Sequence, residues 1–453
     1  MRMAKAKPRT LTLGLLLFLA MNALALNGAI WAIAPEPYNE TVLQHTRDVV
    51  LGRGGDDSWG AMHVALEHVN ASPSVPLYAE IFFNRQYRFQ YPPSALFALT
   101  GLEWIAPERL QIDDFYAGPW PSLNTMLGWL FIALSAGATA ALLEVRLRQE
   151  HPEVDWSQFV LIRGLLAAGF ALTFYPLVKG FTLGQIQVWI NGAFAVALLA
   201  WAMRWKVVSG ILVGAMSLIK PHYGLMILWA LLRGEMRFAL ASAVTIGVGI
   251  AASVAHFGWA NNLDYLGVVS FLSQHGEAFY PNQSVNGLLN RLMSIADPGN
   301  YVSLDLPPGK FPPFTPWIYA VTIVTSAAIL LGGLLHRRAS GDTPRLLDFA
   351  AMALSCTMTS PIAWEHHYGI LLPIYAVALV HALDSRARLA WLALSYVLVS
   401  TFFAPTNMLA ATPLNILQSA GLAGAAIALA FLHRQTPIGS HWPARGAKCM
   451  VVR

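Results

Sequence analysis

Residues 53–59 read Arg53-Gly54-Gly55-Asp56-Asp57-Ser58-Trp59. They lie in a polar stretch, 35–93, between a first apolar run and Tyr91-Pro92-Pro93, where an apolar run resumes. Paired prolines cannot lie inside a helix but suit its first turn, so we expect a helix to begin at this point. A long polar loop that carries an acidic pair and ends at a helix start is where we expect chemistry to take place.

The composition of the whole chain indicates an integral membrane protein. Of 453 residues, 56% are hydrophobic and 12% are charged, whereas soluble domains carry about 25% charged residues. The mean hydropathy is +0.51. The net charge of +5 is typical of cytoplasmic loops in a membrane protein, and we expect no nucleic-acid partner. The two cysteines, Cys356 and Cys449, form no disulfide framework and show no metal-ligand spacing.

The N-terminus is basic from Arg2 to Arg9 and precedes an apolar run that ends near Ala34. One interpretation is a cleaved signal peptide, with 23–25 as the cleavage site. The run is about 24 residues long, which exceeds the core of about 7–15 residues in a signal peptide. We therefore favour an uncleaved first helix over 10–34.

Recurring basic clusters set the expected topology, because cytoplasmic loops of membrane proteins are enriched in lysine and arginine. We place Arg146/Arg148, Arg204/Lys206, Arg233/Arg237, Arg337/Arg338/Arg345, Arg386/Arg388 and Arg434/Arg445/Lys448 inside the cell. With the first helix, about twelve helices then form one transmembrane domain over 1–453, with both termini inside. The other helices are expected at 121–144, 159–176, 185–203, 207–219, 222–233, 238–257, 315–336, 347–360, 367–383, 389–404 and 414–432.

The predicted outer loops include two long ones, 35–93 and 258–314, which we expect to form the site. The first carries short interfacial helices, and the second is partly helical around 284–295. The shorter outer loops are 177–184, 220–221, 361–366 and 405–413, and a cytoplasmic tail covers 433–453. Residues 94–106 span about 20 Å at 1.5 Å per residue, against a bilayer core of about 30 Å. We favour a re-entrant or interfacial element there, with a short crossing in a thinned bilayer as the alternative.

Ionisable and amide side chains near lipid-level helices are functional candidates, because they are costly there. The acidic pair Asp56-Asp57 is either a solvated turn or holds a general base, which glycosyl transfer to an alcohol requires. Lys220, at a break between two short apolar runs, suits a phosphate or snorkels to the interface. The side-chain amides of Gln185 and Asn191 are expected either to contact the substrate or to form hydrogen bonds between helices in the lipid.

Two later segments add further candidates. Arg291 follows Asn282-Gln283 and has the planar donor set that clamps a phosphate. Trp364-Glu365-His366-His367 either holds a phosphate or sugar or belongs to an interfacial belt. Adjacent histidines point to different faces of a helix, and no third ligand follows at metal spacing, so we expect no metal.

In this order, these pieces resemble glycosyltransferase family 87, which has the polytopic GT-C fold and uses polyprenyl-phosphate sugars. The resemblance runs from about 57 to 367. It places the family's catalytic aspartate on Asp56-Asp57, with Asp57 favoured, and the donor phosphate near Lys220, Arg291 and His366 or His367. The other matching pieces are Tyr91-Pro92-Pro93, Gly184-Gln185 with Asn191, Lys220-Pro221, Asn282-Gln283-Ser284, and Ser360-Pro361 with Trp364 and Glu365.

The resemblance implies an inverting enzyme that moves a sugar, commonly mannose in this family, from a polyprenyl-phosphate donor to a hydroxyl of a lipid or glycan acceptor. It implies a bacterial inner membrane location, with the site facing the periplasm or exterior, in contact with membrane lipids. The leaving phosphate has basic side chains beside it, so the chemistry requires no cofactor. The alternative is a flippase or transporter of lipid-linked sugars, but the broken segment at Lys220 has no obvious counterpart in the other half of the chain, as many transporters would have.

Overall fold

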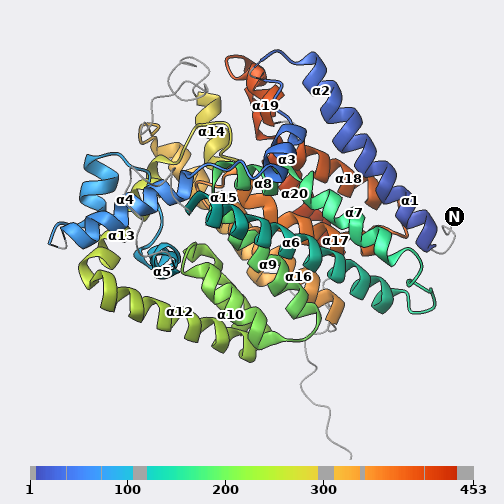
Figure 1. Ribbon diagram of the computed structural model, residues 1–453, viewed down its shortest axis with the longest axis horizontal. Helices are drawn as coiled ribbons and strands as arrows, with labels where there is room; N and C mark the ends of the chain where they lie inside the picture. Colours follow the sequence, from blue (N-terminus) through green and yellow to red (C-terminus); the bar gives the residue numbers. More distant parts are fainter. Residues whose placement is uncertain are drawn as a thin grey trace, which may run out of the picture.

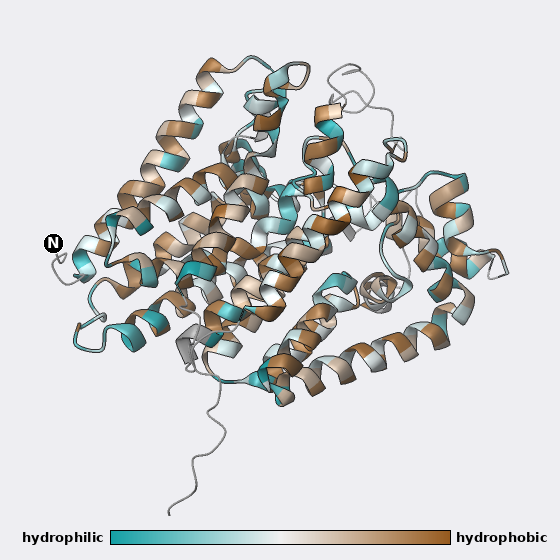
Figure 2. Cartoon of the chain, turned by 180° about the vertical axis from the view of Figure 1, so that it is seen from behind, coloured by the Kyte–Doolittle hydropathy of each residue, from teal (hydrophilic) through white to brown (hydrophobic). Residues whose placement is uncertain are grey.

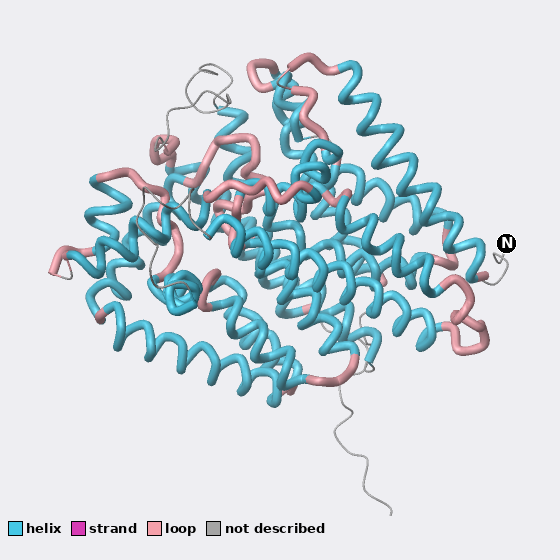
Figure 3. Tube along the Cα trace, viewed as in Figure 1, coloured by secondary structure: helices cyan, strands magenta, loops and turns pink. Residues whose placement is uncertain are grey.

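The computed structural model describes residues 7–36, 38–72, 74–105, 120–293, 311–336, 342–401 and 403–435. Within these ranges the chain is helical and contains no strand, as Figures 1 and 3 show; Asn282 and Trp364 form an isolated antiparallel bridge. Five helices there are long and apolar enough to cross a membrane, or six if one bent pair is a single span. The predicted all-α polytopic membrane fold is therefore confirmed.

Three of the long helical segments lie on the outside of the bundle, and Figure 2 shows that they consist largely of hydrophobic residues. In α12 (Met236–Phe257) and α15 (Pro316–Leu335), only 22% of the apolar window is buried, as expected for helices that face lipid. The others are Pro8–Ile33, made of α1, η1 and α2, then α6 (Trp120–Glu150) and Pro413–Arg434, made of η9 and α20.

The remaining predicted helices exist but are short. At 1.5 Å per residue, α10 (Lys206–Ser217) and α11 (Leu225–Arg233) are about 18 and 14 Å long, well below a bilayer core of about 30 Å. The break between them, at Lys220, therefore lies inside the bundle. The other short helices are α7 (Val160–Leu172), α9 (Gln187–Ala202), α16 (Asp342–Met358), α17 (Leu371–Ala382) and α18 (Arg386–Ser400).

Two predicted loops were wrong in part. Residues 177–184, expected as a loop, belong mostly to α8 (Tyr175–Leu183), which is bent by 54° from α7. Pro176 occupies the first turn of α8, where a proline is tolerated, and so starts a new helix instead of continuing α7. Within 258–314, α13 (Trp259–His275) precedes the expected helix, α14 (Val285–Met293).

The first loop carries short helices, as predicted: α3 (Val42–Val50), α4 (Asp57–Ala71) and η2 (Ala79–Asn84). A hydrophobic core cluster forms beneath these short helices, in which Trp59 and Leu66 of α4 pack with Phe89 and Leu96. A helix does begin at Pro93, with η3 (Pro93–Ala95) leading into α5 (Leu96–Ile105). The described part of α5 is about 15 Å long, against a bilayer core of about 30 Å, and the re-entrant or interfacial element stays a prediction.

The end of α6 and the starts of α12 and α18 carry predicted cytoplasmic arginines, and we call this side of the bundle the basic end. Arg163 Nε lies 2.6 Å from Glu144, and Arg233 Nε lies 2.7 Å from Asp348. Arg388 donates to Gln435 at 3.0 Å, which joins the ends of α18 and α20. The basic positions beyond 435 and at 337–338 lie outside the described residues. We call the opposite end, with α3, α4, α13 and α14, the site end (Figure 1).

Candidate active site

The loop that carries the acidic pair is fastened to the C-terminal end of α8. The Gly55 amide donates to the Thr182 carbonyl at 2.9 Å, and the Ser58 amide donates to the Gly184 carbonyl at 3.4 Å. Gly184 has φ +70°, and a Cβ there would lie 1.9 Å from the Gly55 carbonyl oxygen. Only glycine fits this conformation and this approach, so Gly184 fixes where Asp57 begins α4.

The two aspartates have different surroundings. Asp57 accepts a hydrogen bond from the Gln185 side-chain amide. The carbonyl oxygen of the same Gln185 side chain accepts from Ser58 Oγ at 2.7 Å and from the Tyr91 hydroxyl at 3.1 Å. The Asp56 carboxylate lies instead over the first turn of α4, where a Cβ at Gly60 would be 2.9 Å from Oδ2. Gln185 and Tyr91 were both predicted as site residues. Gln185 holds the carboxylate of Asp57 directly, and Tyr91 holds Gln185.

The environment of Asp57 changes its affinity for a proton. Burial raises the pKa of the Asp57 carboxyl, while the hydrogen bond from Gln185 lowers it. The neighbouring Asp56 charge raises this pKa further, and Arg88 and Lys179 lower it. A carboxylate with a raised pKa is suited to removing a proton near neutral pH.

A second group of polar side chains surrounds Lys220. The Lys220 ammonium contacts Nε2 of His367, and both residues are buried. His366 is only 3% exposed, yet neither of its ring nitrogens has a hydrogen-bond partner within the described part of the chain. Buried polar atoms without partners are rare in folded proteins. A cation beside two such imidazoles can therefore accept an anionic ligand.

Glu365 lies next to these histidines and is 1% exposed. Tyr175 donates from its hydroxyl to Glu365 Oε1 at 3.3 Å, whereas Oε2 has no partner among the residues that the structure describes. Burial raises the pKa of Glu365 to about 7. The preceding Trp364 forms the isolated bridge with Asn282.

Several predicted residues hold the backbone of this segment in place. Asn191 donates from its side chain to the His366 carbonyl at 3.2 Å. Asn282 accepts from the Ala363 amide at 2.9 Å, and Gln283 donates to the Gln418 carbonyl at 2.8 Å. These contacts join segments far apart in the sequence, so their polarity has a structural purpose. Substrate contact by these three side chains stays a prediction.

Arg291, predicted to bind phosphate, is fully buried in α14. Its terminal nitrogens donate to the Asn282 carbonyl at 2.8 Å, the Phe279 carbonyl at 3.3 Å and Ser419 Oγ at 2.6 Å. Across the described ranges, Nε of Arg291 has no partner. The guanidinium thus braces the loop that contains Asn282, and its predicted contact with phosphate stays untested.

The sequence analysis missed a charged cluster on the exposed side of α8. Lys179 Nζ lies 3.4 Å from Glu40 Oε1, and His45 Nε2 lies 3.0 Å from the same oxygen. Thr182 Oγ1 is 2.9 Å from His45 Nδ1. The sequence offered one signal for this cluster. Lys179 lies four residues after Tyr175, in a short segment that was predicted to be a loop.

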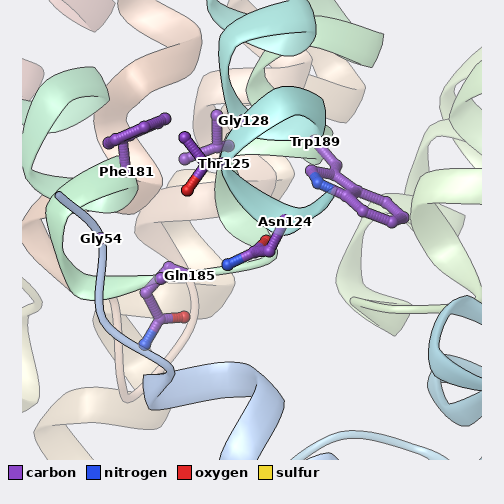
Figure 4. Close-up of a pocket in the computed structure, with 9 residues that line it drawn as sticks. Gly54, Asn124, Thr125, Gly128, Phe181, Gln185 and Trp189 are labelled. Atoms are coloured by element: carbon purple, nitrogen blue, oxygen red, sulfur yellow. The ribbon is translucent and has the colours of Figure 1, made fainter. Parts of the chain in front are cut away.

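A small pocket adjoins the Asp57–Gln185 contact (Figure 4). It lies between the first turns of α6, the end of α8 and the start of α9. Asn124, Gln185 and Trp189 line it together with Gly54 and Phe181. One of its lining residues, Gln185, also donates to the carboxylate of Asp57.

Comparison with known proteins identifies the family of this chain. The profile of glycosyltransferase family 87 matches residues 89–361. The polyprenol-phosphate-mannose-dependent alpha-(1-2)-phosphatidylinositol mannoside mannosyltransferase of Mycolicibacterium smegmatis is 24% identical over 335 residues, 70% of this chain and 68% of that protein. No solved structure matches. Because the family profile covers more than half of the chain, this membrane protein belongs to glycosyltransferase family 87 and is a glycosyltransferase.

Proposed function

We propose that this enzyme transfers mannose from a polyprenyl-phosphate donor to a hydroxyl of a lipid or glycan acceptor, with inversion at the sugar. The supporting observation is that α8 contacts both parts of the site. It binds the loop of Asp57 through backbone hydrogen bonds, and it packs against η7, which carries His367, the partner of Lys220. The similar mycobacterial protein is named for dependence on polyprenol-phosphate-mannose and for a lipid acceptor. That name supports the donor class and the sugar.

Asp57 is the general base in this proposal. It takes the proton of the acceptor hydroxyl as the oxygen bonds to C1 of the sugar. The bond between C1 and the phosphate oxygen breaks, and its electron pair leaves with the polyprenyl phosphate. Attack opposite the departing phosphate inverts C1, so a β-linked donor gives an α-linked product.

Lys220, His366 and His367 stabilise the charge that builds up on the departing phosphate. Groups already fixed in a site with little water are effective in this role, because they need no reorganisation as charge develops. Lys220 is 9% exposed and His367 is 6% exposed, so little water reaches them. Arg291 through Nε, Glu365 and Trp364 complete the proposed donor site.

The acceptor approaches Asp57 from the pocket beside Gln185. Asn124 and Gln185 offer amide groups there, and Trp189 offers an aromatic edge (Figure 4). Tyr91 and Gln185 act through Asp57 by orienting its carboxylate. The amide groups of this lining support an acceptor with a polar, hydroxyl-bearing part, which is a lipid head group or a glycan.

The basic end faces the cytoplasm in this proposal, because short loops rich in lysine and arginine stay inside. The site end then faces the periplasm or exterior of a bacterial inner membrane. The donor's isoprenoid tail lies between helices, in contact with membrane lipid. Labelling an introduced cysteine near α4 with a membrane-impermeant reagent in intact cells tests this orientation.

The reaction itself is tested with purified protein in detergent, a radiolabelled polyprenyl-phosphate-mannose and a lipid extract as acceptor. A product formed without a second compartment distinguishes transfer from transport. Asp57→Asn should reduce the rate by at least about 100-fold, as for loss of a general base, while Asp56→Asn stays within a few-fold of wild type. The control is Asp155→Asn, which changes an exposed carboxylate outside the site. Full activity of Asp57→Asn would remove this residue from the mechanism.

A further inference from the structure

We propose that Lys179 is a second cationic ligand of the donor phosphate, and that Glu40 holds its ammonium until the phosphate arrives. The inference rests on the function proposed above and adds a residue to the same site. It is carried by the position of α8 between the two halves of the site and by the weak pairing of Lys179.

Helix α8 contacts both halves of the site directly. At its C-terminal end it binds the loop 54–58 through backbone hydrogen bonds. On another side it packs against η7 (Glu365–Ile370), where a Cβ at Gly180 would lie 3.4 Å from Cβ of His366. Lys179 is the residue before Gly180. Burial has the largest effect on both groups: it raises the pKa of Asp57 and lowers that of His366. The charge of Lys179 acts on both groups as well and lowers the pKa of each.

The present partner of Lys179 is suited to exchange. The Lys179–Glu40 distance of 3.4 Å is long for a charge-assisted hydrogen bond, which is usually about 2.7–2.9 Å. The Glu40 side chain is 41% exposed, whereas that of Lys179 is 13% exposed. Exposed ion pairs contribute little to stability. Glu40 also lies 3.0 Å from His45 Nε2, so it keeps a partner when Lys179 turns towards a phosphate.

The chemistry of the donor explains why a second lysine is useful. The donor is a phosphodiester with one negative charge, and the departing polyprenyl phosphate is a monoester that approaches two. A lysine is a compact point charge that follows this change. It stabilises the transition state and the released polyprenyl phosphate more than the bound donor, so it raises the rate more than it tightens donor binding.

The experiment compares Lys179→Gln, Lys179→Arg and wild type by kcat, donor KM and the inhibition constant of added polyprenyl phosphate. We expect Lys179→Gln to lower kcat by about 10- to 100-fold, as for loss of one charge-stabilising donor. The inhibition constant should rise by a larger factor than the donor KM, and Lys179→Arg should recover most of both. A purely structural lysine would change the two binding constants alike. The control is Arg47→Gln, which removes an exposed cation from α3.

Glu40→Gln tests the same inference with Lys179 intact, and so applies even if Lys179→Gln does not fold. Release from a weak exposed pair should lower the inhibition constant of polyprenyl phosphate by about threefold; an unchanged or higher value would overturn the inference. So would normal kcat and inhibition in folded Lys179→Gln. If wild type transfers no sugar, the proposed function fails instead. If wild type is active and Lys220→Gln is impaired while Lys179→Gln is normal, only the role of Lys179 fails.

Discussion

Replacing Gln185 with methionine removes the amide that donates to Asp57 while nearly keeping the length of the side chain. A hydrogen bond to a charged group contributes about 1.5–3 kcal/mol, and 1.36 kcal/mol corresponds to one pKa unit. Losing this bond disfavours the ionised form of Asp57, whose pKa is already raised by burial. The acid limb of the pH–activity profile should therefore move to higher pH by about one to two units.

The direction follows from the role of a base. Asp57 must be ionised to take a proton, so activity is lost as the pH falls through its pKa, and a higher pKa moves that loss upward. At a pH above the raised pKa, most of the variant's Asp57 is ionised again. The kcat/KM of Gln185→Met should therefore come within about tenfold of wild type at high pH. The assay is transfer of radiolabelled sugar in detergent at half-unit steps from pH 4.5 to 9.

Two controls separate the hydrogen bond from general damage. Tyr91→Phe removes a hydroxyl from the far side of Gln185 but leaves the amide on Asp57, so its limb should move less. Size-exclusion chromatography of Gln185→Met checks that the protein is folded. A folded, active Gln185→Met with the wild-type acid limb would refute the reasoning that this amide tunes the base.

Three further predictions concern the framework of the site. Gly184→Ala, which sets a Cβ 1.9 Å from the Gly55 carbonyl oxygen, should lower activity by at least about tenfold through displacement of the acidic loop; unchanged kcat would contradict this. Asp348→Ala leaves Arg233 without this carboxylate and should cost about 2–3 kcal/mol, seen as a lower melting temperature, while Asp348→Asn costs less. Asn282→Ala, which breaks three side-chain hydrogen bonds, should lower both the melting temperature and kcat, and normal values for both would show that these three bonds are dispensable.

Local features of the sequence were sufficient for most of the helices. Long apolar runs predicted the first helix, α12 and α15, because a membrane span must be long and apolar whatever its neighbours are. Pro92-Pro93 predicted a helix start, and Lys220-Pro221 predicted a break between two short helices. Proline acts on its own turn, so these effects need no tertiary information.

Helices α8 and α13 were missed because they are short or polar and depend on their packing. The pairing of Lys179 with Glu40 joins residues 139 positions apart, and no local pattern indicates it. The contacts of Arg291 were not predicted either. Its residue type suggested phosphate, which stays a prediction, and the structure adds that its terminal nitrogens donate to carbonyl and hydroxyl oxygens of the protein.

The sequence by itself determined that this is a helical membrane protein with polar candidates at one end, because hydropathy, charge and proline act over a few residues. Only the tertiary structure decided which candidates meet. It joined Asp57 to Gln185 and Lys220 to His367, gave the carboxylates of Asp56 and Asp57 different surroundings, and paired Lys179 with Glu40. These contacts depend on how α8, α10 and η7 pack together, and packing sums many weak contacts that no single segment encodes.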